Sequence, residues 1–208
     1  MPMPDIDLPE GLWRATPNEW AQVGEITAEA FAHDPVASWT FGNREGMRAA
    51  FGMLARHVYI ARGICHLAKH GATMWLPPGK SKKLPLWSEF YLGLRLMKTC
   101  GMGSISRSLA TDAKMNQHRP TERHLYWFTI GVLAAARGQG LASKLMDPML
   151  ALADRECLPV YLENTNPSNS SIYESRGFVR QEIFWPGDGA PPLEAMLRTP
   201  MRQVTHSG

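Results

Sequence analysis

The second half of the chain has the clearest hydrophobic pattern. Residues 125–133 form an apolar run rich in aromatic and β-branched side chains, which stops at a turn of small residues. Beyond this turn, Leu141, Leu145 and Met149 recur at intervals of four, which puts them on one face of a helix. The pattern therefore predicts that the apolar run is a strand and that a helix follows over residues 138 to about 157.

The first half alternates shorter segments. Thr16 can cap a helix, Pro17 suits its first turn, and Glu19 completes a capping box. We expect this helix to end near Asp34, because Pro35 disfavours helical geometry in the residue before it. The other elements predicted in this half are strands over residues 12–15, 64–69 and 72–76 and helices over residues 43–61, 86–98 and 104–115.

The end of the chain alternates strands with a short helix. Residues 159–163, 179–185 and 193–198 have the pattern of strands, and the helix ends near Arg176, where Gly177 can form a left-handed cap. This alternation, with antiparallel pairs near the start, predicts an α/β fold around a mixed sheet. The basic run at residues 80–83 is expected to be a solvated loop.

Composition and charge limit the possible partners. The chain is 44% hydrophobic and 20% charged, as in soluble globular proteins, and its net charge of +3 is too small to indicate nucleic-acid binding. We expect one domain over residues 12–200, with flexible termini at 1–11 and 201–208. The three cysteines are widely spaced, and no export signal or membrane span is evident, so a cytoplasmic protein with reduced thiols is predicted.

No metal site is expected. His66 and His70 are four residues apart, but on the predicted strand and turn their side chains do not converge. Paired cysteines and the usual motifs of hydrolases and metalloenzymes are missing from the sequence.

The turn after the 125–133 strand is a candidate phosphate-binding loop. A glycine-rich turn that opens a helix presents free backbone N–H groups and the positive end of the helix dipole. The spacing fits neither the Walker A loop nor the dinucleotide-binding fingerprint, but it fits Arg/Gln-x-x-Gly-x-Gly/Ala through Arg137, Gly140 and Ala142. The alternative is an ordinary glycine-rich connection between a strand and a helix.

Residues along the whole second half resemble the GCN5-related N-acetyltransferases (GNATs). The matching positions are Val132, Arg137 to Ala142, Leu162, Glu163, Asn166, Asn169, Tyr173, Glu174, Gly177 and Phe178. Within this superfamily the chain looks like the puromycin N-acetyltransferase branch, in which Pro148, Asn169 and the segments at residues 30–35 and 118–120 have counterparts. A departure is Ala134, where many members have proline. The resemblance extends over residues 12–198.

The resemblance implies a fold, a co-substrate and a set of site residues. The fold is the α/β GNAT fold, in which helices flank a mixed, mostly antiparallel sheet and a splayed central strand pair holds acetyl-CoA. The residues that would contact acetyl-CoA are Val132, Arg137, Gly138, Gln139, Gly140, Leu141, Ala142, Asn166 and Asn169. Arg137 could instead brace the loop, and one of the two asparagines could cap the short helix.

Two residues are the catalytic candidates. Tyr173 corresponds to the family's general acid, which protonates the departing thiolate; the alternative is an aromatic side chain that only packs. Glu163, at the end of an apolar strand, is the first candidate for the base, or it is a structural carboxylate. Phe31, His33 and Asp34 are expected to line the acceptor pocket, with His33 and Asp34 as weaker candidates for the base and as possible caps of the helix end.

The predicted function is the direct transfer of an acetyl group from acetyl-CoA to a primary amine of a small molecule. The alternatives are a non-catalytic acyl-CoA sensor and an acetyltransferase for protein lysines or N-termini. A small-molecule amine is the expected partner, without nucleic acid, membrane or metal, and the chain is expected to be a monomer or a homodimer. The identity of the amine does not follow from the sequence.

Overall fold

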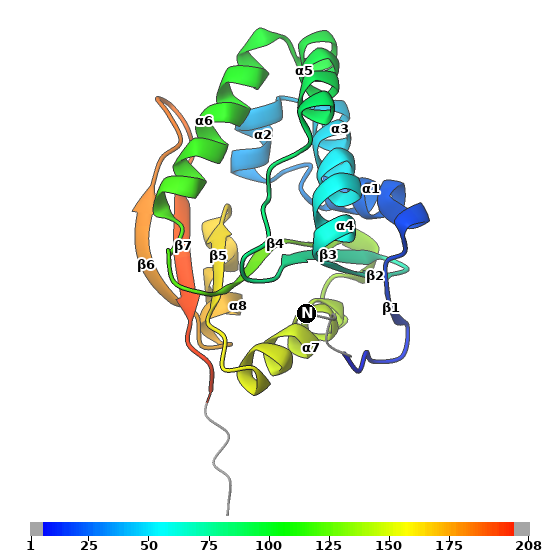
Figure 1. Ribbon diagram of the computed structural model, residues 1–208, viewed down its shortest axis with the longest axis vertical. Helices are drawn as coiled ribbons and strands as arrows, with labels where there is room; N and C mark the ends of the chain where they lie inside the picture. Colours follow the sequence, from blue (N-terminus) through cyan, green and yellow to red (C-terminus); the bar gives the residue numbers. More distant parts are fainter. Residues whose placement is uncertain (1–5, 202–208) are drawn as a thin grey trace, which may run out of the picture.

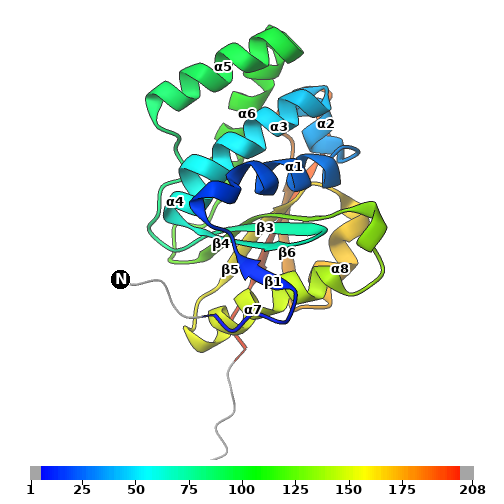
Figure 2. The ribbon, with the colours of Figure 1, turned by 90° about the vertical axis from the view of Figure 1, so that its right-hand side faces the viewer.

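The computed structural model describes residues 6–201, which form one seven-stranded sheet between two helical layers (Figures 1 and 2). The strand order is β1-β2-β3-β4-β5-β7-β6, and every neighbouring pair is antiparallel except β4 and β5, which are parallel. The strands are β1 Leu12–Arg14, β2 Ile64–Ala68, β3 Gly71–Leu76, β4 Leu125–Val132, β5 Val160–Asn164, β6 Val179–Phe184 and β7 Leu193–Arg198. The predicted α/β GNAT fold is confirmed. The expected flexible termini fall mostly outside the described residues.

Most helices cover one face of the sheet (Figure 2). They are α1 Trp20–Ala30, α2 Pro35–Phe41, α3 Arg44–Leu54, α4 Ile60–Arg62, α5 Leu86–Cys100 and α6 Met102–His118. The other face carries α7 Leu141–Arg155 and α8 Ser170–Glu174. Short turns complete the chain: η1 Pro17–Glu19, the π-helical η2 Ala55–Tyr59, η3 Ala134–Ala136 and η4 Pro167–Asn169. Because both faces are covered, every residue of β2 and β3 is buried.

The first helix begins as predicted, at the capping box formed by Thr16 and Glu19. The helix expected over residues 43–61 is present but interrupted by the π-helical turn η2. The α1 and α3 helices cross at Gly24 and Gly52, where a Cβ on Gly24 would lie only 2.6 Å from the Cα of Gly52. The two glycines therefore let the backbones of α1 and α3 approach closely.

One helix was not predicted. In the sequence, Asp34 and Pro35 mark the end of the first helix, but in the structure they also begin α2, with Asp34 as the N-cap and Pro35 in the first turn. The Asp34 side chain accepts a hydrogen bond from the Ala37 backbone N–H at 2.8 Å. An aspartate followed by proline satisfies the rules for a helix start as well as those for a stop. The expectation that Asp34 caps the end of the first helix is therefore wrong.

The prediction for the basic run at residues 80–83 was also wrong at one position. Lys82 is mostly buried, and its ammonium lies 2.6 Å from a carboxylate oxygen of Asp112 on α6. Burial and the nearby Arg119 lower the pKa of Lys82, while Asp112 raises it. The segment from residue 77 to residue 124, which contains α5 and α6, therefore adds buried charges to the helical side of the sheet.

Candidate active site

The central strands separate at the middle of the sheet. Pairing between β4 and β5 runs only from Leu125–Val160 to Trp127–Leu162, although β4 continues to Val132. At the same level the register of β3 against β4 shifts, which leaves Phe128 without a partner in a β-bulge. A bulge increases local twist, and here it coincides with the point where β4 leaves β5. The result is a wedge between the two strands, edged by backbone groups of β4 that have no partner on β5.

The predicted phosphate loop lies at the open end of this wedge. Gly138 and Gly140 both have a φ of +75°, which favours glycine, and a Cβ on either residue would meet no atom within 4 Å. Gly140 is also the N-cap of α7, and the first turn of that helix contains no acidic residue. The backbone is therefore open to a ligand at the positive end of a helix dipole, which suits the pyrophosphate of acetyl-CoA.

The side chains of the loop stabilise its shape. Arg137 donates from Nε to the carbonyl of Val132 at 3.2 Å, and Gln139 donates from Nε2 to the carbonyl of Ala135 at 2.9 Å. Both side chains remain exposed, whereas Leu141 and Ala142 are half-buried, with Ala142 packed against the core between the sheet and α7. Arg137 therefore braces the loop, and the backbone N–H groups are the part of the loop that stays open to an anion.

Tyr173 lies on α8, on the same face of the sheet as α7. Its ring packs edge-on against Trp127 and Phe178, with ring centroids 5.5 Å and 6.0 Å apart. Burial raises the pKa of Tyr173, and the negative charge of Asp34 raises it further. The phenol therefore keeps its proton at neutral pH, close enough to Asp34 to respond to its charge.

Asp34 is held at the mouth of the wedge from both sides. Its Oδ1 accepts from Ala37, and its Oδ2 accepts a hydrogen bond of 2.6 Å from the hydroxyl of Thr165, directly after β5. Burial raises the pKa of Asp34 to about 6, although these two hydrogen bonds lower it. Thr165, 131 residues away in the chain, was not predicted as a site residue. The contact brings the turn between α1 and α2 to the end of β5.

Glu163 points away from Tyr173. Side chains alternate between the two faces of the sheet along β5. Glu163 therefore lies on the same face as Tyr161, the face covered by α1 to α6, whereas Leu162 belongs to the core beneath α7. The side chain of Glu163 is only 1% exposed, and its nearest cation is the guanidinium of Arg119 at 3.9 Å. Burial raises the pKa of Glu163, while Arg119 and Lys82 lower it. Glu163 is thus a buried carboxylate whose charge is offset by Arg119 and Lys82.

The remaining predicted residues differ in what they do. The Asn166 side chain caps η4 by accepting from the Ser168 N–H at 3.1 Å, whereas Asn169 makes no side-chain cap and is available to a ligand. Phe31 packs against Phe51, with ring centroids 5.5 Å apart, and His33 is exposed.

Among residues 6–201, no group of three or more His, Cys, Asp or Glu side chains could hold a metal ion. None of the helices in that range has the length and apolar character to cross a bilayer.

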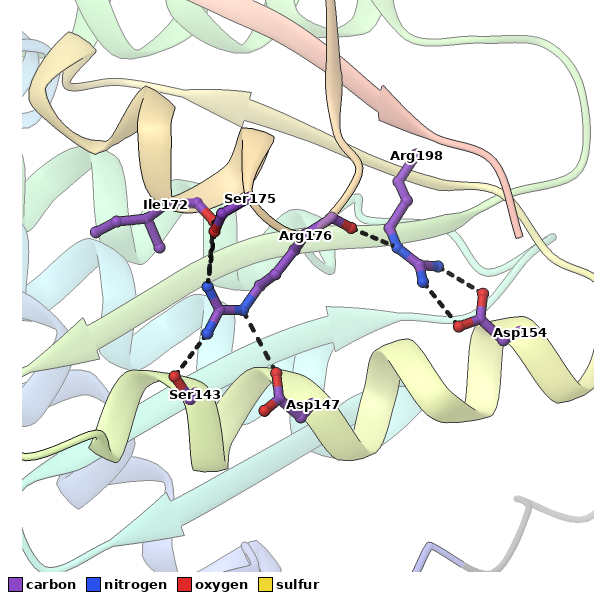
Figure 3. A network of polar contacts seen from close by, with 7 residues as sticks. All are labelled: Ser143, Asp147, Asp154, Ile172, Ser175, Arg176 and Arg198. Atoms are coloured by element: carbon purple, nitrogen blue, oxygen red, sulfur yellow. Dashed lines mark hydrogen bonds and ion pairs between the residues drawn. The ribbon is translucent and has the colours of Figure 1, made fainter. Parts of the chain in front are cut away.

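A clamp that was not predicted fixes α8 to α7 (Figure 3). Arg176 donates from Nη2 to the Ser143 hydroxyl at 2.6 Å and lies 3.4 Å from Asp147, both on α7. The same guanidinium donates to the Ile172 carbonyl and to Ser175. Arg176 thereby links the first turns of α7, beside the phosphate loop, to the helix that carries Tyr173.

A second ion pair anchors this clamp (Figure 3). The backbone carbonyl of Arg176 accepts from Nε of Arg198 on β7, and Arg198 forms a two-bonded pair with Asp154 at 2.7 Å for each bond. Such bidentate pairs are stronger and more directional than single hydrogen bonds. The end of α8 is therefore held between α7 and β7.

Replacing Arg176 with methionine should destabilise the fold. The variant keeps most of the apolar stem but leaves the polar partners on α7 and α8 unpaired, so we expect the free energy of unfolding to fall by about 1–3 kcal/mol in urea denaturation. Arg48→Met is the matched control, since it removes a half-exposed ion pair with Glu25 that should contribute less than about 1 kcal/mol. Equal losses in the two variants would show that the clamp adds nothing beyond a surface pair.

Comparisons with known proteins agree with this arrangement. Residues 89–180 match the model of an acetyltransferase (GNAT) domain family. An uncharacterized N-acetyltransferase of Schizosaccharomyces pombe is 27% identical over 204 residues, covering 90% of this chain and 82% of the yeast protein.

Solved structures share the fold over nearly the whole chain. One, described as histone acetyltransferase HPA2 and related acetyltransferase, from Corynebacterium glutamicum, has a TM-score of 0.68 at 23% identity, covering 93% of this chain and 97% of that one. Arylalkylamine N-acetyltransferase 2 from Aedes aegypti has a TM-score of 0.59 at 13% identity, and the match covers 90% of this chain and 97% of the mosquito protein. The family model and the yeast relative thus point the same way as the fold, and the chain is an acetyl-CoA-dependent acyltransferase of the GNAT type.

Proposed function

We propose that this enzyme acetylates a primary amine of a small molecule. The observation that carries the proposal is the covered acceptor side of the wedge. On that face Trp39 of α2 packs against the connection between β6 and β7, where a Cβ on Gly187 would lie 3.5 Å from the indole. His118, at the end of α6, stacks on Phe184 with ring centroids 4.1 Å apart and contacts Glu182 at 2.6 Å. A face closed by α2 and α6 favours a small acceptor over a protein segment.

The resemblance to puromycin N-acetyltransferases supports the same acceptor class, as does the name of the mosquito arylalkylamine enzyme.

The three cysteines are free, which is consistent with the predicted cytoplasmic setting. We further propose that residues 12–200 act as one catalytic domain, because one sheet connects β1 to β7.

The loop and the wedge would hold acetyl-CoA. The backbone of Gly138 to Ala142 would bind the pyrophosphate, and the free edge of β4 near Val132 and the Asn169 side chain would contact the pantetheine arm. Bound acetyl-CoA supplies the acetyl group as a thioester and a thiolate as its leaving group. Each of these contacts uses a group that the fold leaves open to a ligand.

We assign the two proton transfers to Tyr173 and Asp34, which are close enough for the charge of Asp34 to raise the pKa of the phenol. Tyr173 holds a proton on its phenol and would give it to the departing sulfur, whose thiol has a pKa of about 8.5. Asp34, with a pKa of about 6, is ionised at neutral pH and would take the proton that the amine loses. Glu163 is the alternative base, but its side chain is only 1% exposed and its carboxylate lies 3.9 Å from the guanidinium of Arg119. We therefore assign the base role to Asp34 and a structural role to Glu163.

The test combines binding with turnover on the same sample. Acetyl-CoA at about 100 times its dissociation constant should stabilise the fold by roughly 2.7 kcal/mol in thermal denaturation. Thiol release should then appear with a panel of small primary amines and be weak with lysine-containing or free N-terminal peptides.

Other outcomes would contradict the proposal. Release that requires peptides would make the acceptor a protein. Stabilisation without release from any amine would indicate a sensor of acyl-CoA. An unchanged melting temperature would show that the loop at residues 137–142 does not bind the co-substrate.

A further inference from the structure

An apolar stripe runs along the outer side of α5. The exposed side chains lie at helical spacing, at positions 86, 90, 94 and 97 on one line and 87 and 91 on the next. They are Leu86, Trp87, Phe90, Tyr91, Leu94 and Met97, and each is between 44% and 84% exposed. The opposite side of the helix, with Ser88 and Leu96, is buried against its neighbours. We call the six exposed side chains the α5 stripe.

The α5 stripe is larger than the apolar patches of ordinary monomers. From their exposed fractions, the six side chains leave roughly 700–900 Å² of surface in contact with solvent. The largest patch on a typical monomer is about 300–600 Å². A standard protein interface buries about 800 Å² on each partner, which equals the area of the stripe. The stripe is therefore large enough to form one side of a stable interface.

The position of α5 leaves the stripe free to dock. The helix packs its inner side on α3 and α6, and Trp87 also meets the ring of His57 on η2, with ring centroids 4.8 Å apart. Figures 1 and 2 show α5 at the outer edge of the helical layer, with no other described element beyond it. Figure 2 also shows α5 on the far side of α1 and α3 from the sheet and α7.

A glycine next to the stripe fits a close neighbour. Gly93 is in the middle of α5, where glycine costs about 1 kcal/mol relative to alanine. A Cβ at this position would meet no atom of residues 6–201 within 4 Å, so no contact within that part of the chain explains the glycine. A missing side chain on an outer helix face allows the backbone of another helix to approach.

We propose that two copies of this chain associate through the α5 stripe. In a two-fold dimer the same patch is presented by both partners, so an apolar stripe meets an equally apolar stripe. The exposed charges of the helix are mixed, with Glu89 near its start and Arg95 and Lys98 near its end. A helix that binds a lipid surface is instead rich in lysine and arginine on its polar side. The stripe therefore fits a second copy better than an anionic membrane.

The test is the oligomeric state of the full chain. Sedimentation velocity at roughly 1–100 µM, a range in which such interfaces associate, should give twice the chain mass of 23.2 kDa. The double variant Leu86→Lys/Phe90→Lys should sediment as one chain throughout. Since both side chains are mostly exposed, its melting temperature at low concentration should match that of the wild type measured as a monomer.

Matched controls make the outcome decisive. Val179→Lys adds a charge at an equally exposed apolar residue on β6 and should leave the dimer intact. A wild-type chain that stays single at about 100 µM, or a dimer that survives the double variant, would overturn the proposal. Co-sedimentation of a monomeric wild type with phosphatidylcholine–phosphatidylserine vesicles, lost in the double variant, would also overturn it and assign the stripe to lipid.

Discussion

Asp34→Asn should lower kcat by about 10²–10³-fold, because it removes the group that we propose as the base. The substitution changes little else. Asparagine caps helices as well as aspartate does, so its carbonyl can still accept from Ala37. The Thr165 hydroxyl can rotate to accept from the new amide instead of donating to a carboxylate. Steady-state kinetics with a reactive small amine would measure the loss.

The pH dependence gives an independent readout of the same assignment. Burial raises the pKa of Asp34 to about 6, so the basic form is present above this pH and is lost as the pH falls through it. The wild-type profile of kcat/KM should therefore have an acidic limb near pH 6, and the residual activity of Asp34→Asn should lack that limb.

Stability should change in the opposite direction to activity. The folded state holds the Asp34 proton more tightly than the unfolded state, so the stability contributed by this group is present below about pH 4 and declines as the pH rises to about 6. Above pH 6 the chain carries a buried charge that the asparagine variant lacks. We therefore expect Asp34→Asn to be at least as stable as the wild type at neutral pH, so that a loss of activity cannot come from unfolding.

Glu163→Gln is the reciprocal variant. If Asp34 is the base, the loss in kcat from Glu163→Gln should be much smaller than that from Asp34→Asn, measured per folded enzyme. A large loss with Glu163→Gln, together with a mild effect of Asp34→Asn, would return the base role to Glu163.

The parts of the site that could be predicted are those set by neighbouring residues. The run to Val132, the glycine turn and the start of α7 depend on periodicity and on positive-φ glycines that are close in the chain. The same holds for the capping box at residues 16–19. Local rules were sufficient here because each contact joins residues a few positions apart.

The contacts that were missed join distant segments. Asp34 meets Thr165 across 131 residues, and Arg176 reaches Ser143 across 33. Nothing in the residues around Lys82 indicates that Asp112 will cover it, so a basic run was assigned to solvent. Pairing of this kind depends on how the sheet and the inserted helices bring the segments together, and a periodic pattern does not encode it.

The choice between two carboxylates shows the same limit. The sequence favoured Glu163 because it ends an apolar strand, which correctly predicts burial. Burial alone does not say which face of the sheet the side chain occupies, and β5 turns Glu163 toward Arg119 and Lys82. Asp34, which looked like a helix end, begins α2 and accepts a hydrogen bond from Thr165 at the end of β5, where its charge raises the pKa of Tyr173.

Tyr173→Phe should lower kcat by at least about tenfold while the dissociation constant for acetyl-CoA changes little. The hydroxyl is the only part removed, and the ring contacts with Trp127 and Phe178 are edge-on packing that phenylalanine can keep. The expected loss therefore comes from the missing proton donor to the departing sulfur. Single-turnover thiol release would measure the rate, and calorimetric titration with acetyl-CoA would measure the affinity.

The leaving group provides the decisive control for Tyr173. A thioester whose thiol is more acidic than that of coenzyme A needs less protonation as it departs, so the difference between Tyr173→Phe and the wild type should shrink with such a donor. A purely packing role predicts the same loss with both donors, because a misplaced helix α8 would slow them equally. An unchanged rate in Tyr173→Phe would remove the acid role altogether, and the proton would then have to reach the sulfur from solvent.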